Sequence, residues 1–384
     1  MVFLRLLSTL AGLVVLCSVL LDALETVVLP RRVRGRFRMS VWYYGLAWGP
    51  WVALMKRIRS QSRREALLAY FGPLSLLLLL ALWANGLIFG FALVQQGTGS
   101  HLLLADADVS FGRLLYHSGE TFFTLGYGDI VPASGWSRFL AVLEAGMGFA
   151  FLGIVIGYLP TIYSAFSRRE IEISLLDARA GSPPAAAELL RRYGPCSRGE
   201  GLDRLFQAWE RWSAEVLESH LSYPVLSFFR SQHNNQSWLA ALTTVLDATA
   251  LVIVGVDGIP NEQAKITFAV ARHAVVDLSQ VVRTRYDPCA LDRLPLPALA
   301  RLRTSLADMG LQLCAGSAAD EKLRTLRAMY EPYVEALARS LLITLPGWVA
   351  TAPTVDNWQV APWDEAVSAR TVSAPSSYNS EDHF

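Results

Sequence analysis

The chain has 384 residues, of which 53% are hydrophobic and 17% charged, and its formal net charge at pH 7 is +1. The hydrophobic fraction exceeds the roughly 45–50% usual for soluble proteins, and the mean hydropathy is +0.32. This composition favours a membrane protein over a soluble one, and the length allows more than one domain. A charge near zero gives no sign of a nucleic-acid partner, and none is expected.

Three stretches are long and apolar enough to cross a bilayer as helices, which takes about 20 residues. They are residues 6–29, 66–94 and 136–165. Residues 95–135 contain Arg113 as their single Lys or Arg, whereas the segment between the first two stretches contains ten: Arg31, Arg32, Arg34, Arg36, Arg38, Lys56, Arg57, Arg59, Arg63 and Arg64. Because basic loops stay in the cytoplasm, we expect a multi-pass protein of the cell membrane whose N-terminus is outside and whose C-terminal part is cytoplasmic.

Two apolar segments, one at the N-terminus and one further along the chain, each have two possible interpretations. Residues 1–29 could be a cleaved signal peptide, since Arg5 precedes the apolar run. The basic cluster that follows, and the lack of a small-x-small cleavage pattern, favour a retained span. Residues 238–256 could be a fourth span, but Asp247 at their centre and the absence of basic flanks favour a buried helix in a cytoplasmic domain.

Residues 39–59 are rich in Trp and Tyr and end in basic residues. This composition is typical of a segment at the inner headgroup boundary. It indicates either an ordinary aromatic belt or a segment that senses anionic lipids. The four cysteines have no paired spacing, so we expect neither a disulfide nor a zinc site; they are Cys17, Cys196, Cys289 and Cys314.

The segment "TFFTLGYGD", residues 121–129, has no acid, base or nucleophile from Leu125 to Gly128. Its remaining chemistry is a row of carbonyl oxygens, and carbonyls bind cations. It lies between the second and third stretches, within residues 111–132, which are too short and broken to cross the bilayer as one helix. Non-helical backbone at membrane depth is tolerated where it lines a cavity. We therefore expect a re-entrant helix over residues 112–123, whose negative dipole end favours a cation.

This segment resembles the selectivity-filter signature of potassium channels, through Thr121, Thr124, Gly126, Tyr127, Gly128 and Asp129. Residues 66–166 are most similar to the two-helix pores of bacterial potassium channels. The resemblance implies stacked ion sites formed by the Thr124 hydroxyl and by the carbonyls of Thr124, Leu125, Gly126 and Tyr127. It also implies a homotetramer, since the family builds each filter from four loops. Leu125 departs from the valine that is usual in the family.

The resemblance extends to residues around the filter. Glu120 holds the place of a buried acid that such channels pair with the acid after the filter, here Asp129. Gly148 matches a hinge glycine of the inner helix and Gly153 a second small position, while Pro160 would bend the helix near a cytoplasmic gate. Gly148 could instead serve close helix packing.

Glu144 is an acid within the third apolar stretch, where a charge is costly. It either faces a water-filled cavity as a cation site or bonds to the pore helix.

We expect an all-α membrane protein with a re-entrant pore helix, a selectivity filter and an α-helical cytoplasmic domain. Its expected parts are an N-terminal transmembrane helix (1–29), a basic interfacial segment (30–65), a pore domain (66–166), a helical cytoplasmic domain (167–348) and a disordered tail (349–384). The expected function is passive, potassium-selective conduction through a tetrameric pore, gated through the cytoplasmic domain by an unidentified signal. The expected partners are potassium ions and membrane lipids, with no cofactor and no enzymatic activity.

Two other functions remain open. A nonselective cation channel would keep the pore, although the intact Gly126–Gly128 argues against it. A membrane-anchored enzyme or signalling scaffold would place its chemistry in the cytoplasmic domain. A metal site there would draw on residues without ligand spacing: His220, His233, His273, Asp247 and Asp277.

Overall fold

The computed structural model describes residues 2–27, 39–100, 102–104, 110–193, 200–231, 236–285 and 292–349. Several expectations lie outside these residues: the basic loop at 31–38, the tail beyond residue 349, Cys196, Cys289 and His233. Within the described part the protein is almost entirely helical, and four helical stretches are long and apolar enough to cross a membrane. The expected all-α membrane protein is confirmed.

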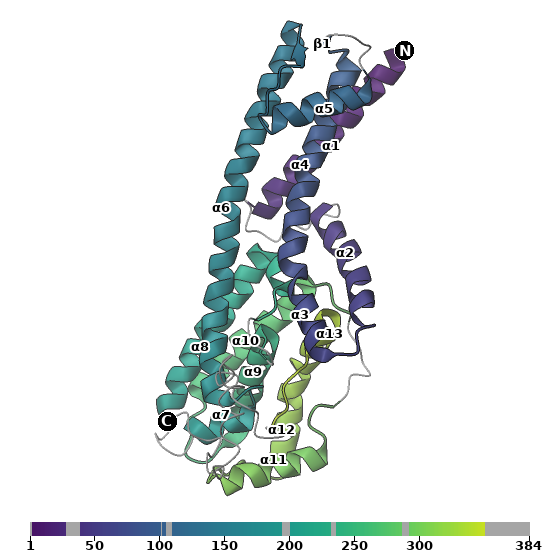
Figure 1. Cartoon of the computed structure of the whole chain (residues 1–384). Helices are drawn as coiled ribbons and strands as arrows, with labels where there is room; N and C mark the ends of the chain where they lie inside the picture. The colour runs from purple at the N-terminus through teal and green to yellow at the C-terminus, as the bar shows by residue number, and fades with distance from the viewer. Residues whose placement is uncertain are drawn as a thin grey trace, which may run out of the picture. The chain divides into compact units, whose positions relative to one another are not determined.

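The chain divides into two compact units, Met1–Ser164 and Ala165–Phe384. The division falls inside one uninterrupted helix, α6 (Gly135–Ala180) (Figure 1). The first unit contains α1 (Val2–Val27), α2 (Met39–Met55), α3 (Gln61–Ala69), α4 (Phe71–Thr98), β1 (Leu102–Leu104), α5 (Phe111–Phe122), β2 (Ile130–Pro132) and the first part of α6.

Helix α1 packs antiparallel along α4, and glycines line the seam between them. A Cβ on Gly97 would lie 2.5 Å from the carbonyl oxygen of Arg5, and a Cβ on Gly12 would lie 2.7 Å from that of Gly90. Such close backbone approach is typical of helices that associate inside a membrane, where small residues replace the hydrophobic driving force. The retention of α1 as a span stays a prediction.

A short antiparallel ribbon joins the two sides of the pore loop. β1 pairs with β2 so that Leu102 faces Pro132 and Leu104 faces Ile130. The segment before α5 is thereby held to the segment that follows "GYGD". This pairing was not expected from the sequence, because each strand is only three residues long.

The second unit contains the end of α6, α7 (Ala186–Tyr193), α8 (Glu200–Ser222), the 3₁₀ helix η1 (Pro224–Phe228), α9 (Trp238–Gly255), α10 (Glu262–Val281), α11 (Leu296–Asp308), α12 (Ser317–Ala328) and α13 (Glu331–Leu341). Its core includes Ile173, Leu176 and Ala180 from the last turns of α6. The lower part of α6 is therefore a core element of this unit.

Helix α9 lies among α7, α8, α10, α12 and α13 (Figure 1), and its residues from Trp238 to Val254 are all buried. Asp247 at its centre forms a bidentate ion pair with Arg293 (2.7 and 3.1 Å) and accepts a hydrogen bond from the Tyr330 hydroxyl (2.5 Å). A buried charge is tolerated when it is paired and hydrogen-bonded in this way. The environment of α9 is thus that of a core helix rather than a lipid-facing span.

Candidate functional site

The pore loop begins at the C-terminal end of α5, which closes with a Schellman motif. The Thr124 amide donates to the Thr121 carbonyl (3.1 Å), and the Leu125 amide donates to the Glu120 carbonyl (2.8 Å). Glycine usually occupies the left-handed position of this motif. Here it is Thr124, with φ of +54°, and a non-glycine residue in this region marks a strained backbone of the kind found at functional sites.

Left-handed conformations recur at every second residue of the loop. Thr124, Gly126 and Gly128 have φ values of +54°, +64° and +81°. Leu125 and Tyr127, which alternate with them, do not have positive φ. A Cβ on Gly126 or Gly128 would contact nothing within 4 Å, so torsion rather than space demands glycine there.

Glu120 is a buried residue of α5 that ties the pore helix to the far end of the loop. Its Oε1 accepts a hydrogen bond from the Gly128 amide at 3.3 Å. Asp129 is exposed, and no hydrogen bond joins it to Glu120 among the residues that the structure describes. Within one chain, Glu120 therefore acts on a backbone amide of the filter segment rather than on the acid expected to pair with it.

Helix α6 approaches the end of α5 most closely at Gly148. A Cβ at that position would overlap the Phe122 carbonyl oxygen and lie 2.9 Å from its carbonyl carbon. This contact supports the packing interpretation of Gly148. A Cβ on Gly153 would meet nothing within 4 Å, and α6 continues past Pro160 without a break. A hinge or a bend at these positions stays a prediction.

Glu144 is fully buried between α4, α5 and α6. It accepts a hydrogen bond from Gln95 Nε2 at 3.0 Å and contacts the hydroxyl of Ser118, which itself bonds to the Ile88 carbonyl at 2.7 Å. A cavity-lining side chain of a pore built by several chains would be exposed on a single chain. The cavity expectation for Glu144 is therefore corrected to the alternative, a bond to the pore helix.

Ser118 and Gln95 were not singled out from the sequence. Both have polar neighbours in the sequence, His117 beside Ser118 and Gln96 beside Gln95, so neither stands out there. What could not be read from the sequence is that α4, α5 and α6 bring these two side chains to the same carboxyl group.

The filter segment and one face of α6 are uncovered. Tyr127 is 72% exposed and Phe149 on α6 also 72%. Other large exposed side chains of α6 are Phe139, Val142, Leu152 and Ile156. Apolar surface of this extent marks contact with lipid or with other chains.

The histidines and acids considered for a metal site are not assembled, as far as the structure describes them. Asp247 is held by Arg293 and Tyr330, His220 by Arg169, and exposed His273 lies 3.4 Å from Asp277. Among the described residues, no group of three or more His, Cys, Asp or Glu side chains could hold a metal ion.

A buried cluster joins the end of α6 to α8 and η1. Arg169 donates to the carbonyls of Leu226 and Phe229 (both 2.9 Å) and contacts Nε2 of His220 at 3.2 Å. The His220 Nδ1 lies 2.8 Å from the Val216 carbonyl, which makes Nδ1 the donor and leaves Nε2 to accept from Arg169. Burial, together with the charge of Arg169, lowers the pKa of His220 to about 3, so the ring is neutral.

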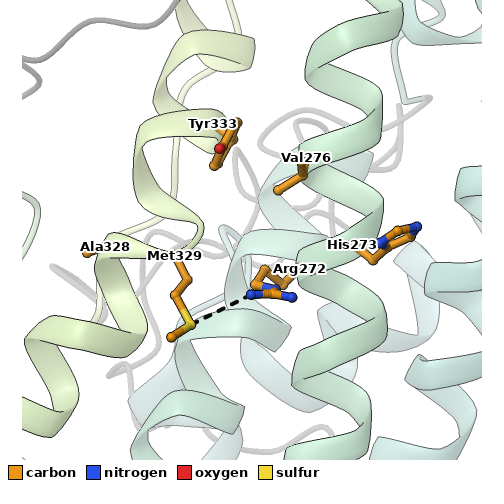
Figure 2. A pocket seen from close by; sticks show the side chains of 6 residues that line it. All are labelled: Arg272, His273, Val276, Ala328, Met329 and Tyr333. Carbon is orange, nitrogen blue, oxygen red and sulfur yellow. Dashed lines mark hydrogen bonds between the residues drawn. The ribbon is translucent and has the colours of Figure 1, made fainter.

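The second unit also has a surface pocket of about 350 Å³ between α10 and the α12–α13 junction (Figure 2). Arg272, His273 and Tyr333 contribute hydrogen-bonding groups, and Val276, Ala328 and Met329 complete the lining. Arg272 Nη1 contacts the sulfur of Met329 at 3.8 Å. Within the described part of the second unit no acid lines this pocket, so its chemistry suits an anion rather than a metal cation.

Comparison with known proteins gives a family match within the first unit. Residues 78–164 match the family model described as "Ion channel". The chain is 23% identical over 302 residues to the "Uncharacterized membrane protein YdjJ" of Bacillus subtilis (strain 168), covering 77% of this chain and 84% of that protein. It is 29% identical over 84 residues to "Protein LctB" of Geobacillus stearothermophilus, covering 19% of this chain and 62% of that protein. No solved structure matches significantly.

The matched residues contain α5, the filter segment and the part of α6 that packs against them. The protein is therefore an all-α membrane protein that carries an ion channel domain over residues 78–164.

Proposed function

We propose that the protein is a potassium-selective channel subunit. The observation that carries the proposal is the strained loop of residues 124–128, where left-handed torsions alternate and no acid, base or nucleophile lies from Leu125 to Gly128. Potassium filters work by replacing the hydration shell of the ion with backbone carbonyls. Thr124, Leu125, Gly126 and Tyr127 supply these carbonyls, and the Glu120–Gly128 bond holds the loop to the pore helix.

The conducting unit in this proposal is a homotetramer, because one chain contributes one loop and a ring of carbonyls needs four. Exposed Tyr127 and the exposed face of α6 support assembly, since they offer apolar surface for contact with neighbouring chains. The N-terminus and the pore loop lie outside and the second unit in the cytoplasm, in agreement with the basic residues between the first two spans.

Gating through the second unit is part of the same proposal. The helix that packs behind the filter continues as a core element of that unit, and Arg169 fastens its continuation to α8 and η1. In this proposal a change in the packing of the second unit reaches the inner helix through α6, which is continuous from one region to the other. Pro160 and Gly153 lie between the two regions and are the proposed points of bending.

The test is flux from liposomes that contain the purified full-length protein, followed by reversal potentials in mixed sodium and potassium solutions. We expect potassium flux with a reversal potential near that of potassium. Gly126→Ala should abolish flux, because the added Cβ disfavours the left-handed torsion by about 1–2 kcal/mol in each chain. Gly45→Ala is the matched control, since it adds the same methyl group to a helix with free space around it.

Equal permeability to sodium and potassium would replace the proposal with a nonselective cation channel. Selective flux that survives Gly126→Ala would remove the filter assignment. Absence of flux in every condition, with a correctly folded protein, would favour the scaffold alternative.

A further inference from the structure

Helices α2 and α3, with the turn at Lys56–Ser60 between them, form what we call the interfacial hairpin. Helix α2 has no charged residue in its 17 positions. The turn and the start of α3 carry five cations, and Glu65 is the single acid from residue 39 to residue 70. The cations are Lys56, Arg57, Arg59, Arg63 and Arg64. An uncharged helix that ends in a concentrated positive charge is the pattern of a segment at a membrane surface.

One side of the hairpin is fixed to the rest of the first unit. The amide and hydroxyl of Ser40, at the start of α2, donate to the buried carboxylate of Asp22 on α1 (3.1 and 2.9 Å). The Tyr43 hydroxyl donates to the Ser75 carbonyl of α4 at 2.9 Å. The Trp48 ring packs edge-on against Phe71, with 4.7 Å between centroids. The hairpin is therefore positioned by protein contacts.

Part of the surface of α2 is uncovered. Trp42 is 60% exposed, Leu46 70% and Leu54 53%; Trp42 and Leu46 lie one turn apart on one stripe of the helix, and Leu54 lies about two turns further on. This exposed surface leads directly to the cations of the turn. An apolar face joined to a basic end matches a bilayer boundary, where the acyl chains meet the headgroups.

The cations of the hairpin are available for binding. Lys56, Arg57, Arg59 and Arg63 are exposed, and within the described ranges none of them forms an ion pair. Four unpaired positive charges within eight residues would repel one another in solution. A surface of negative headgroups removes that repulsion.

We propose that the interfacial hairpin binds the headgroups of anionic phospholipids, with exposed Trp42, Leu46 and Leu54 against the acyl chains and the four exposed cations on the phosphates. A consequence that rests on the proposed channel function is that such lipids favour conduction. The hairpin leads through Tyr70 straight into α4, and α4 packs on the pore helix α5. Headgroup binding thus acts on the helix that supports the filter segment.

The direct test is quenching of tryptophan fluorescence in liposomes that contain the full-length protein. Brominated phosphatidylglycerol and brominated phosphatidylcholine are compared as quenchers in a phosphatidylcholine background. We expect the wild-type protein to prefer phosphatidylglycerol, and the K56Q/R57Q/R59Q/R63Q variant to lose about tenfold or more of that preference, since each cation contributes near an anionic surface. The matched control, R211Q/K265Q/R285Q/R301Q, removes the same charge from exposed positions of the second unit and should keep the preference.

Equal quenching by the two lipids in the wild-type protein, or an unchanged preference in the hairpin variant, overturns the proposal. Inorganic phosphate at matched ionic strength should not displace phosphatidylglycerol; displacement would assign the cations to a free anion instead.

Potassium flux in the same liposomes separates this proposal from the proposed function. Flux that rises with phosphatidylglycerol in the wild-type and control proteins, but not in the hairpin variant, supports both. A phosphatidylglycerol preference without flux in any lipid contradicts the channel assignment and supports the lipid site. Selective potassium flux without a phosphatidylglycerol preference supports the channel assignment and contradicts the lipid site.

Discussion

The carbonyl carbon of Phe122, the last residue of the pore helix, lies 2.9 Å from the position that a Cβ on Gly148 would occupy. The Phe122 carbonyl oxygen lies closer still. Because the obstruction is backbone and not a movable side chain, α6 approaches the start of the filter segment only as long as residue 148 is glycine.

Gly148→Ala should therefore push α6 away from α5 and destabilise the first unit. Overpacking of this kind costs about 1–3 kcal/mol or more. Gly153→Ala is the control, because its Cβ would enter free space. The thermal unfolding midpoint of the purified protein measures the effect. If Gly148→Ala keeps its stability and only the kinetics of opening change, the hinge interpretation is the correct one.

The contacts of Glu144 predict very different outcomes for two substitutions. Ser118 has one hydroxyl proton and two acceptors, Glu144 and the Ile88 carbonyl, so a neutral carboxyl that itself donates satisfies all three groups. Glu144→Gln can reproduce this arrangement and should be mild. Glu144→Ala leaves buried Ser118 and Gln95 short of partners, at a cost of about 1–3 kcal/mol. Single-channel conductance tests the corrected assignment: a cation site in the cavity would lose conductance in Glu144→Gln.

Glu120 and Asp129 should behave as independent residues. Glu120→Ala removes the acceptor of the Gly128 amide and should weaken the filter end of the loop, lowering stability and expression. Asp129→Asn alters an exposed side chain and should have a smaller effect. If the two substitutions act through separate contacts, their effects add within about 0.5 kcal/mol. Unfolding of the single and double variants checks this, and strong non-additivity would support the Glu120–Asp129 pair that the resemblance implies.

Asp22 should stabilise the N-terminal span and the interfacial hairpin together. Its Oδ2 accepts from the Trp83 indole at 2.8 Å, while both oxygens accept from the Ser40 amide at 3.1 Å. Asp22→Ala leaves these donors without an acceptor and should lower the unfolding midpoint, with a free-energy loss of about 1–3 kcal/mol. Cys17→Ser, at an exposed position of α1, should have little effect. An Asp22→Ala protein as stable as that control would contradict the network.

The stability of the second unit should fall in mild acid because of His220. Its folded pKa of about 3 lies below the ordinary value near 6.5, so the unfolded chain binds the proton first as the pH decreases. The contribution of neutral His220 to the free energy of unfolding is fully present above about pH 6.5. It declines toward pH 3, by at most about 1.4 kcal/mol per pH unit. Unfolding measured from pH 7.5 to 5 should show this slope, and His220→Gln should flatten it. His273→Gln, at an exposed histidine, should not.

The sequence by itself determined the fold class and the place of the channel domain. Three long apolar stretches require helices, since every backbone group in lipid must be satisfied within its own segment. Residues 125–128 have no acid, base or nucleophile, so their carbonyls are the groups left to bind a ligand. A hydropathy pattern or a sequence motif is contained within a few tens of consecutive residues, so it can be recognised without a tertiary structure.

Only the tertiary structure decided what each polar side chain does. Glu144 could not be assigned between a cavity and the pore helix until α4, α5 and α6 brought Gln95 and Ser118 to its carboxyl group. For Gly148 the hinge and packing interpretations were equally open in the sequence, and the Phe122 carbonyl beside it favours packing. In the sequence, Asp247 places an energetically unfavourable charge in an apolar helix. The ion pair with Arg293, 46 residues away in sequence, offsets that cost. These partners are distant along the chain, and their meeting depends on helix packing, which no local pattern encodes.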